Sequence, residues 1–134
     1  MNYGMFRGDS LILNVLVQQL TDPLSPPSVS NPYVPVDLTG AKLWMTAKKK
    51  LTDTDLKAVF QITSPGDITI DAIPTSGRAK VTVPASATTA VVFPADTAQL
   101  DLYYDIQVKT STGIVQTVAS GKLTLTEDVT DAIV

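Results

Sequence analysis

The chain has 134 residues and a formal net charge of −3, and 44% of its residues are hydrophobic. This length fits a single domain, residues 1–134, with a substantial core, and the charge gives no general attraction to nucleic acid or to an anionic membrane. Cysteine and histidine are both absent, which excludes disulfides, thiolate metal sites, a cysteine nucleophile and a Ser-His-Asp triad.

The chain begins with a segment that we expect to be a short N-terminal arm, residues 1–10. Its first residues lack the basic and apolar regions of a signal peptide, and no apolar run approaches the roughly 20 residues that a membrane helix needs. We therefore expect synthesis in the cytoplasm. Within the arm, Arg7-Gly8-Asp9 spells a short adhesion motif, but its position directly before a strand favours a turn.

The first predicted strand is Leu11–Leu20, which is rich in apolar and β-branched residues. Alternation places four apolar side chains on one face, namely Leu11, Leu13, Val15 and Val17. Ile12 and Leu16 are apolar on the opposite face as well. Either this strand is covered on both faces, or its outer face contacts another subunit.

A proline-rich loop, Thr21–Pro35, follows and holds five of the nine prolines. That density excludes helix and central strand, and loops of this length are uncommon in compact domains. Two interpretations stay open: a tolerated surface insertion, or a docking segment that orders on a neighbour. The candidate partner-binding residues of the loop are Pro23, Pro26, Pro27, Pro32 and Tyr33.

Short alternating strands are predicted after the loop. In the first of them, Ala41–Lys48, Trp44 falls on the polar face; it is either a rim residue beside its lysine neighbours or an interface anchor. Further strands are predicted at Leu56–Ile62, Ile68–Ile73 and Arg78–Val83, separated by Pro/Gly turns. Strands at this spacing are typical of an all-β sandwich or barrel.

The chain closes with a predicted hairpin, preceded by a crossover over residues 84–100 that includes a helical turn at Pro94–Leu100. The hairpin joins Asp101–Thr110 to Ile114–Thr126 through a turn containing Gly113. Its predicted inward side chains are Leu102, Tyr104, Ile106 and Val108, then Val115, Ala119, Leu123 and Leu125. A second apolar layer must cover this face.

The C-terminal tail, residues 127–134, is short and apolar at its end. A tail of this kind either frays or lies along a partner. Ile133 of the tail and Phe6 of the N-terminal arm are therefore candidate partner contacts.

No catalytic constellation is visible in the sequence. The acidic residues lie in turns or on polar strand faces, without the spacing of a calcium loop, and the glycines are isolated rather than grouped in a phosphate loop. A pair of carboxylates far apart in the chain would escape this search. We predict no enzymatic activity, no metal and no cofactor. Trp44 and the tyrosines would suit a carbohydrate platform.

Four short motifs carry a resemblance to a known family: Phe6–Asp9, Val36–Gly40, Tyr104–Val108 and Gly121–Thr130. With them the chain resembles the immunoglobulin-like virion proteins of tailed phages, and is similar to the N-terminal domain of the baseplate upper protein family. The resemblance implies an immunoglobulin-like antiparallel β-sandwich with a Pro-rich insertion loop.

The same resemblance implies a non-enzymatic structural role in a phage particle, with several copies at the tail, baseplate or neck. Its partners would be other virion proteins and copies of itself, with neither nucleic acid nor membrane among them. The protein would be made in the host cytoplasm and end in the virion. The alternatives are a capsid decoration protein and a carbohydrate-binding or adhesion module.

Overall fold

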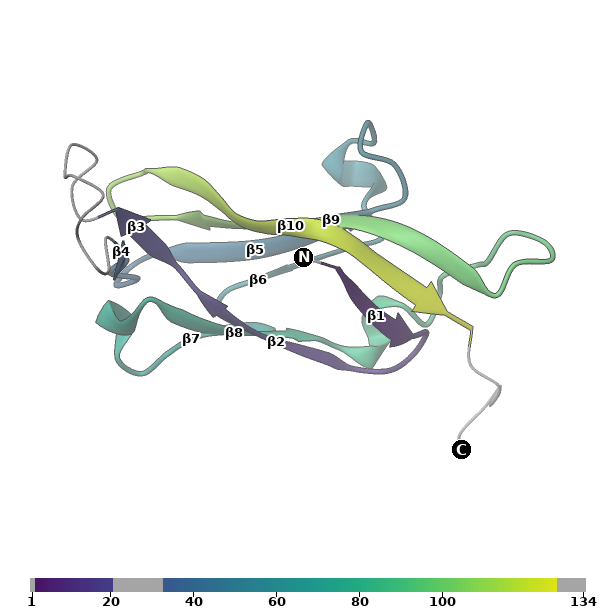
Figure 1. Ribbon diagram of the computed structural model, residues 1–134, viewed down its shortest axis with the longest axis horizontal. Helices are drawn as coiled ribbons and strands as arrows, with labels where there is room; N and C mark the ends of the chain where they lie inside the picture. Colours follow the sequence, from purple (N-terminus) through teal and green to yellow (C-terminus); the bar gives the residue numbers. More distant parts are fainter. Residues whose placement is uncertain (1, 21–32, 128–134) are drawn as a thin grey trace.

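The protein is a two-layer β-sandwich in the computed structural model, which describes residues 2–20 and 33–127 (Figure 1). One layer is a five-stranded sheet of order β1-β10-β9-β5-β6, and the other is a three-stranded sheet of order β2-β8-β7. A two-stranded ribbon, β3-β4, lies at one end. The strands are β1 Tyr3–Phe6, β2 Leu11–Leu16, β3 Gln18–Leu20, β4 Tyr33–Pro35, β5 Lys42–Lys48, β6 Phe60–Thr63, β7 Ile68–Ile70, β8 Arg78–Val83, β9 Gln99–Lys109 and β10 Val115–Thr126.

The strand order is immunoglobulin-like. The three-stranded sheet has the order of strands B, E and D of that fold, and β10-β9-β5-β6 has the order of G, F, C and C′. β1 joins the edge of the five-stranded sheet parallel to β10. The predicted all-β sandwich is confirmed, while most of its Pro-rich insertion, residues 21–32 of the predicted 21–35, lies outside the described residues.

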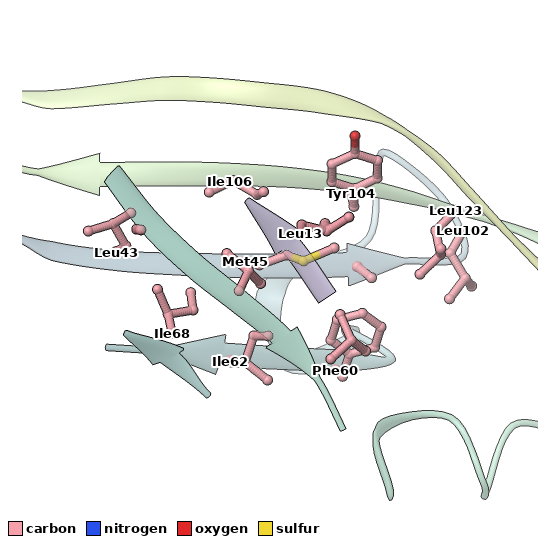
Figure 2. Close-up of a cluster of buried hydrophobic side chains, with 14 of the residues drawn as sticks. Leu13, Leu43, Met45, Phe60, Ile62, Ile68, Leu102, Tyr104, Ile106 and Leu123 are labelled. Atoms are coloured by element: carbon pink, nitrogen blue, oxygen red, sulfur yellow. The ribbon is translucent and has the colours of Figure 1, made fainter. Parts of the chain in front are cut away.

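The core lies between the two sheets and draws on alternate residues of both. Leu13 and Ile68 come from the three-stranded sheet, and Leu43, Met45 and Ile106 from the five-stranded sheet; all are buried in one cluster (Figure 2). Full burial of such side chains stabilises the fold by about 1.5–3 kcal/mol each. The inward face predicted for the first strand of the closing hairpin is confirmed, since its four residues are all buried.

The second strand of the hairpin departs from prediction at its start. A register shift between Thr117 and Ala119 inserts an extra residue, so Ala119 lies opposite Ile106 while Thr117 lies opposite Gln107. Such a bulge reverses the face to which the residues before it point. The prediction for Val115 was therefore wrong: 55% of this residue is exposed.

Part of the predicted N-terminal arm, residues 1–10, is a strand rather than an arm. Tyr3–Phe6 pairs with β10, Met5 is buried in the core, and the side chain of Asn2 accepts a hydrogen bond from the Lys122 N–H at 3.0 Å. The alternation of Tyr3 and Met5 was too short to signal this in the sequence. The turn predicted at Arg7-Gly8-Asp9 is present, with Gly8 at φ 83°.

The first predicted strand is divided in two at Val17. The Val17 N–H donates to the Gly77 carbonyl at 2.8 Å, and the Val17 carbonyl accepts from the Val36 N–H at 2.9 Å. β3 then pairs with β4, so Tyr33–Pro35 is strand where a loop was predicted. Proline is tolerated there because the ribbon has only two strands, both at an edge.

Two other predicted elements differ in extent. The strand predicted at Leu56–Ile62 begins only at Phe60, because Asp55–Lys57 forms a 3₁₀ turn, η1, that leaves Leu56 99% exposed. Residues 91–98 form neither strand nor helix: a turn follows Pro94, whose carbonyl accepts from the Thr97 hydroxyl at 2.7 Å. The remaining 3₁₀ turns are η2 Pro74–Ser76 and η3 Ala85–Ala87.

Candidate functional site

A groove of about 360 Å³ runs across the outward face of the five-stranded sheet. Its floor is formed by β5, β9 and β10, and the segment after β5 closes one end. We call it the outer groove, and its residues are Trp44, Thr46, Lys48, Leu51, Asp55, Tyr103, Tyr104, Asp105, Gln107, Thr117 and Ser120. The volume is at the lower end of the roughly 300–1,000 Å³ of small-molecule sites.

Strand register arranges the outward side chains of the groove in rows. Trp44 of β5 lies opposite Gln107 of β9, which lies opposite Thr117 of β10. One step along, Thr46 lies opposite Asp105, and in the next row Lys48 lies opposite Tyr103. Directly opposite residues on one face of a sheet are close enough to interact, so the groove combines an aromatic, a carboxylate and an amide within two neighbouring rows.

Asp105 is the central polar group of the groove. Partial burial raises the pKa of its carboxyl, the nearby Lys48 ammonium opposes this, and the Asp55 carboxylate adds to it. The side-chain amide of Gln107 donates to the carboxyl at 3.2 Å. An ionised carboxylate offers about four acceptor positions, so Asp105 has the capacity to accept further donors from a ligand.

The charged groups around Asp105 are fixed by contacts of their own. The Lys48 ammonium lies 2.8 Å from the Asp55 carboxylate, and the Lys122 ammonium lies over the ring of Tyr103, 5.8 Å from its centroid. The hydroxyl of Thr46, which is buried, accepts from the Gln61 amide at 2.9 Å. These contacts hold the walls of the groove in place.

A second hollow, of about 490 Å³, lies over the outward face of the three-stranded sheet. Asn14 of β2 and Thr69 of β7 both lie opposite Lys80 of β8, and Leu16 lies opposite Arg78. Most of the side chains that line this hollow are exposed, and the hollow is bordered on one side by β2. We refer to it as the β2 hollow.

β2 itself is an edge strand with apolar side chains on its outward face. Among the described residues it pairs with β8 alone. Ile12 is 54% exposed and Leu16 is 43% exposed. The sequence left two alternatives for this outward face: cover on both faces, or contact with another subunit. The described residues of the chain do not cover it.

The predicted partner-binding residues are scattered. Trp44 is half-buried and lines the outer groove. Phe6 and Tyr33 are each 50% exposed, on β1 and β4 toward different ends of the sandwich (Figure 1). The others lie outside the described residues: Pro23, Pro26, Pro27, Pro32 and Ile133.

Sequence reasoning missed Asp105, Gln107 and Lys48 as groove residues. They stand on the polar faces of two strands that are far apart in the chain, and only the pairing of β5 with β9 brings them together. In residues 2–20 and 33–127, no three acidic side chains lie close enough to hold a metal ion. No helix within those residues is long and apolar enough to span a membrane.

The fold defines the class: this is an immunoglobulin-like β-sandwich. No protein-family model matches the chain, and no curated sequence matches it. Among solved structures, AggA, the major subunit of aggregative adherence fimbriae type I from Escherichia coli, aligns with 95% of this chain and 89% of its own, at 11% identity and a TM-score of 0.27. A likeness this weak carries no inference about function.

Proposed function

We propose that this protein is a non-enzymatic structural component of a tailed bacteriophage particle, present in several copies at the tail, baseplate or neck. A capsid decoration protein is the alternative position in the same kind of particle. The sequence resemblance supports the proposal, and its motifs fall on the sandwich itself: Tyr104–Val108 in β9 and Val36–Gly40 just before β5. The observation that carries the proposal is the edge strand β2, which within the described part of the chain pairs with β8 alone.

Edge strands of stable monomers are usually protected. Charged residues, prolines, bulges or very short length prevent another chain from adding to the sheet. β2 reads Leu-Ile-Leu-Asn-Val-Leu over six residues and has none of these features. The other sheet edges, β1, β6 and β7, are four, four and three residues long. An edge of this composition is stable in solution when a neighbouring subunit covers it.

The partner that fits β2 is an extended segment of a neighbouring virion protein or of a second copy. Such a segment would hydrogen-bond to the free edge and cover Ile12 and Leu16, in the manner of strand addition. The neighbouring β2 hollow, with Arg78 and Lys80, provides polar contacts at the rim of the interface. The proline-rich segment and the C-terminal tail would dock onto neighbours in the same assembly.

Purified particles of the phage that encodes the chain provide the test. Quantitative mass spectrometry should find the protein in several copies per particle. Leu16→Lys should exclude it from particles without unfolding it, because the lysine blocks strand addition. Leu56→Lys is the matched control, since Leu56 is 99% exposed and outside any strand. Particles that lack the wild-type protein would overturn the proposal, and normal incorporation of Leu16→Lys would remove β2 as the docking site.

A further inference from the structure

We infer that the outer groove is a binding site for a neutral carbohydrate. This site is distinct from the proposed docking edge, because it lies on the outward face of the five-stranded sheet while β2 belongs to the other sheet. The inference rests on three properties of the groove: an aromatic ring at one end, hydrogen-bonding groups in its centre, and a balance of charges around it.

The aromatic platform is Trp44. It occupies the row next to Asp105 and remains half-exposed, with Gln107 directly opposite on β9. An indole ring presents a large apolar face with a polar edge, which suits the apolar C–H face of a sugar ring. At the other end of the groove the ring of Tyr103 forms a second wall.

The hydrogen-bonding centre is Asp105 with Gln107. The Gln107 amide nitrogen donates to Asp105 at 3.2 Å and to the Thr117 hydroxyl at 3.4 Å. These two bonds orient the amide, and neither of them uses its oxygen. The partly desolvated carboxylate gains from any further donor, since hydrogen bonds to charged groups are stronger than neutral ones. Each sugar hydroxyl is both a donor and an acceptor, so two adjacent hydroxyls can hydrogen-bond to Asp105 and Gln107 at the same time.

The charges around the groove disfavour an ionic ligand. Lys48, Asp55 and Asp105 line the groove, Lys48 is paired with Asp55 at 2.8 Å, and Lys122 lies beside the groove over the ring of Tyr103, so cations partly offset the two carboxylates. A cationic ligand would meet the Lys48 ammonium group, and an anionic ligand would meet the carboxylates of Asp55 and Asp105. A neutral ligand with many hydroxyls avoids both penalties and uses donors and acceptors alike.

The test uses the fact that Trp44 is the only tryptophan in the chain. Its fluorescence in the whole protein therefore reports on the outer groove. Titration with neutral oligosaccharides of glucose, galactose, mannose and N-acetylhexosamines should give a saturable change with at least one of them. Asp105→Asn should weaken that binding about tenfold or more, because it removes a charge-assisted hydrogen bond.

Asp71→Asn is the matched control, because Asp71 lines the β2 hollow and its Oδ1, which accepts from the Ile73 N–H at 2.9 Å, is kept in asparagine. This variant should bind the sugar as the wild type does. The inference would be overturned by the absence of a fluorescence change with any neutral sugar, by equal binding of Asp105→Asn, or by a response to oligolysine or polyphosphate instead. Hydrolysis of the sugar would also overturn it, by showing a catalytic site.

The two proposals fail separately. Asp105→Asn should leave incorporation into particles unchanged, and Leu16→Lys should leave sugar binding unchanged, since the two sites lie on different sheets. A protein that binds sugar but is missing from particles would retain the groove assignment and refute the virion role.

Discussion

The carbonyl oxygen of Val17 lies only 2.6 Å from the position that a Cβ at Gly77 would occupy. The two residues are joined by a hydrogen bond from the Val17 N–H to the Gly77 carbonyl at 2.8 Å. Gly77 also has φ 71°, a left-handed conformation that favours glycine. This contact fixes the point at which the chain leaves β2 and enters the β3-β4 ribbon.

Gly77→Ala should therefore be strongly destabilising. The added methyl group meets backbone on one side and Pro35 on the other, so we expect a loss of about 3 kcal/mol in the free energy of unfolding. Gly113→Ala is the control: φ is 91° there too, but a Cβ would have no neighbour within 4 Å, so the loss should be about 1 kcal/mol. Urea unfolding measures both, and equal losses would contradict the close approach.

A buried serine holds β5 to the end of β6. The Ser64 hydroxyl accepts from the Leu43 N–H at 2.9 Å in a buried position. Ser64→Ala leaves that N–H unpaired, which should cost about 1–3 kcal/mol in unfolding free energy. Ser76→Ala, which removes an exposed hydroxyl that accepts from the Arg78 N–H at 3.3 Å, should cost far less. Similar thermal stability of Ser64→Ala and the wild type would disprove the buried bond.

Asp105 should make stability depend on pH. Its pKa is raised in the folded state, mainly by desolvation, so the folded chain binds the proton more tightly than the unfolded chain does. The contribution of Asp105 to the free energy of unfolding therefore falls as pH rises from its ordinary pKa of 3.8 through its raised pKa in the folded state. Asp105→Asn should be more stable than the wild type at pH 7, and this advantage should vanish below pH 3.8. Thermal unfolding at both pH values measures it.

Asp37 provides the control of opposite sign. Its carboxylate accepts from the Thr39 hydroxyl at 2.6 Å and from the Thr39 N–H at 2.9 Å, and these bonds lower its pKa. The stabilisation is present above pH 3.8 and is lost as pH falls through the lowered pKa. Asp37→Asn should thus be less stable than the wild type at pH 7. A gain in the stability of Asp37→Asn at pH 7 would contradict the lowered pKa of Asp37.

The proline-rich segment should be dispensable for folding but needed for assembly. Leu20 and Tyr33 are paired at the open end of the β3-β4 ribbon, so deletion of residues 23–32 leaves a two-residue connection, Thr21-Asp22. Replacing that pair by Asn-Gly gives a favourable hairpin turn and controls for strain. Both variants should fold, as judged by circular dichroism, and both should fail to enter particles. Normal incorporation would exclude a docking role for this segment.

The parts of the fold that the sequence predicts well are those with long alternation. Leu102 to Val108 alternate without interruption, and their inward face is confirmed. The bulge at Thr117–Ala119 is invisible in the sequence, because one inserted residue leaves an alternating pattern on each side of it. β1 is missed because four residues are too few to distinguish a strand from an arm.

The outer groove could be predicted only in part. Alternation correctly places Trp44 on the outward face of β5. The residues that complete the groove, Asp105 and Gln107, depend on how β5 is aligned with β9, which are separated by about fifty residues of chain. Register between distant strands is set by the packing of the whole core, and no local pattern encodes it.

A density map of the assembled particle tests the central claim most directly. The account predicts that every copy of this chain has an extended segment of a neighbouring subunit paired along Leu11–Leu16, with Ile12 and Leu16 covered. A map in which β2 faces solvent in all copies, or in which the sandwich is absent from the particle, would contradict it.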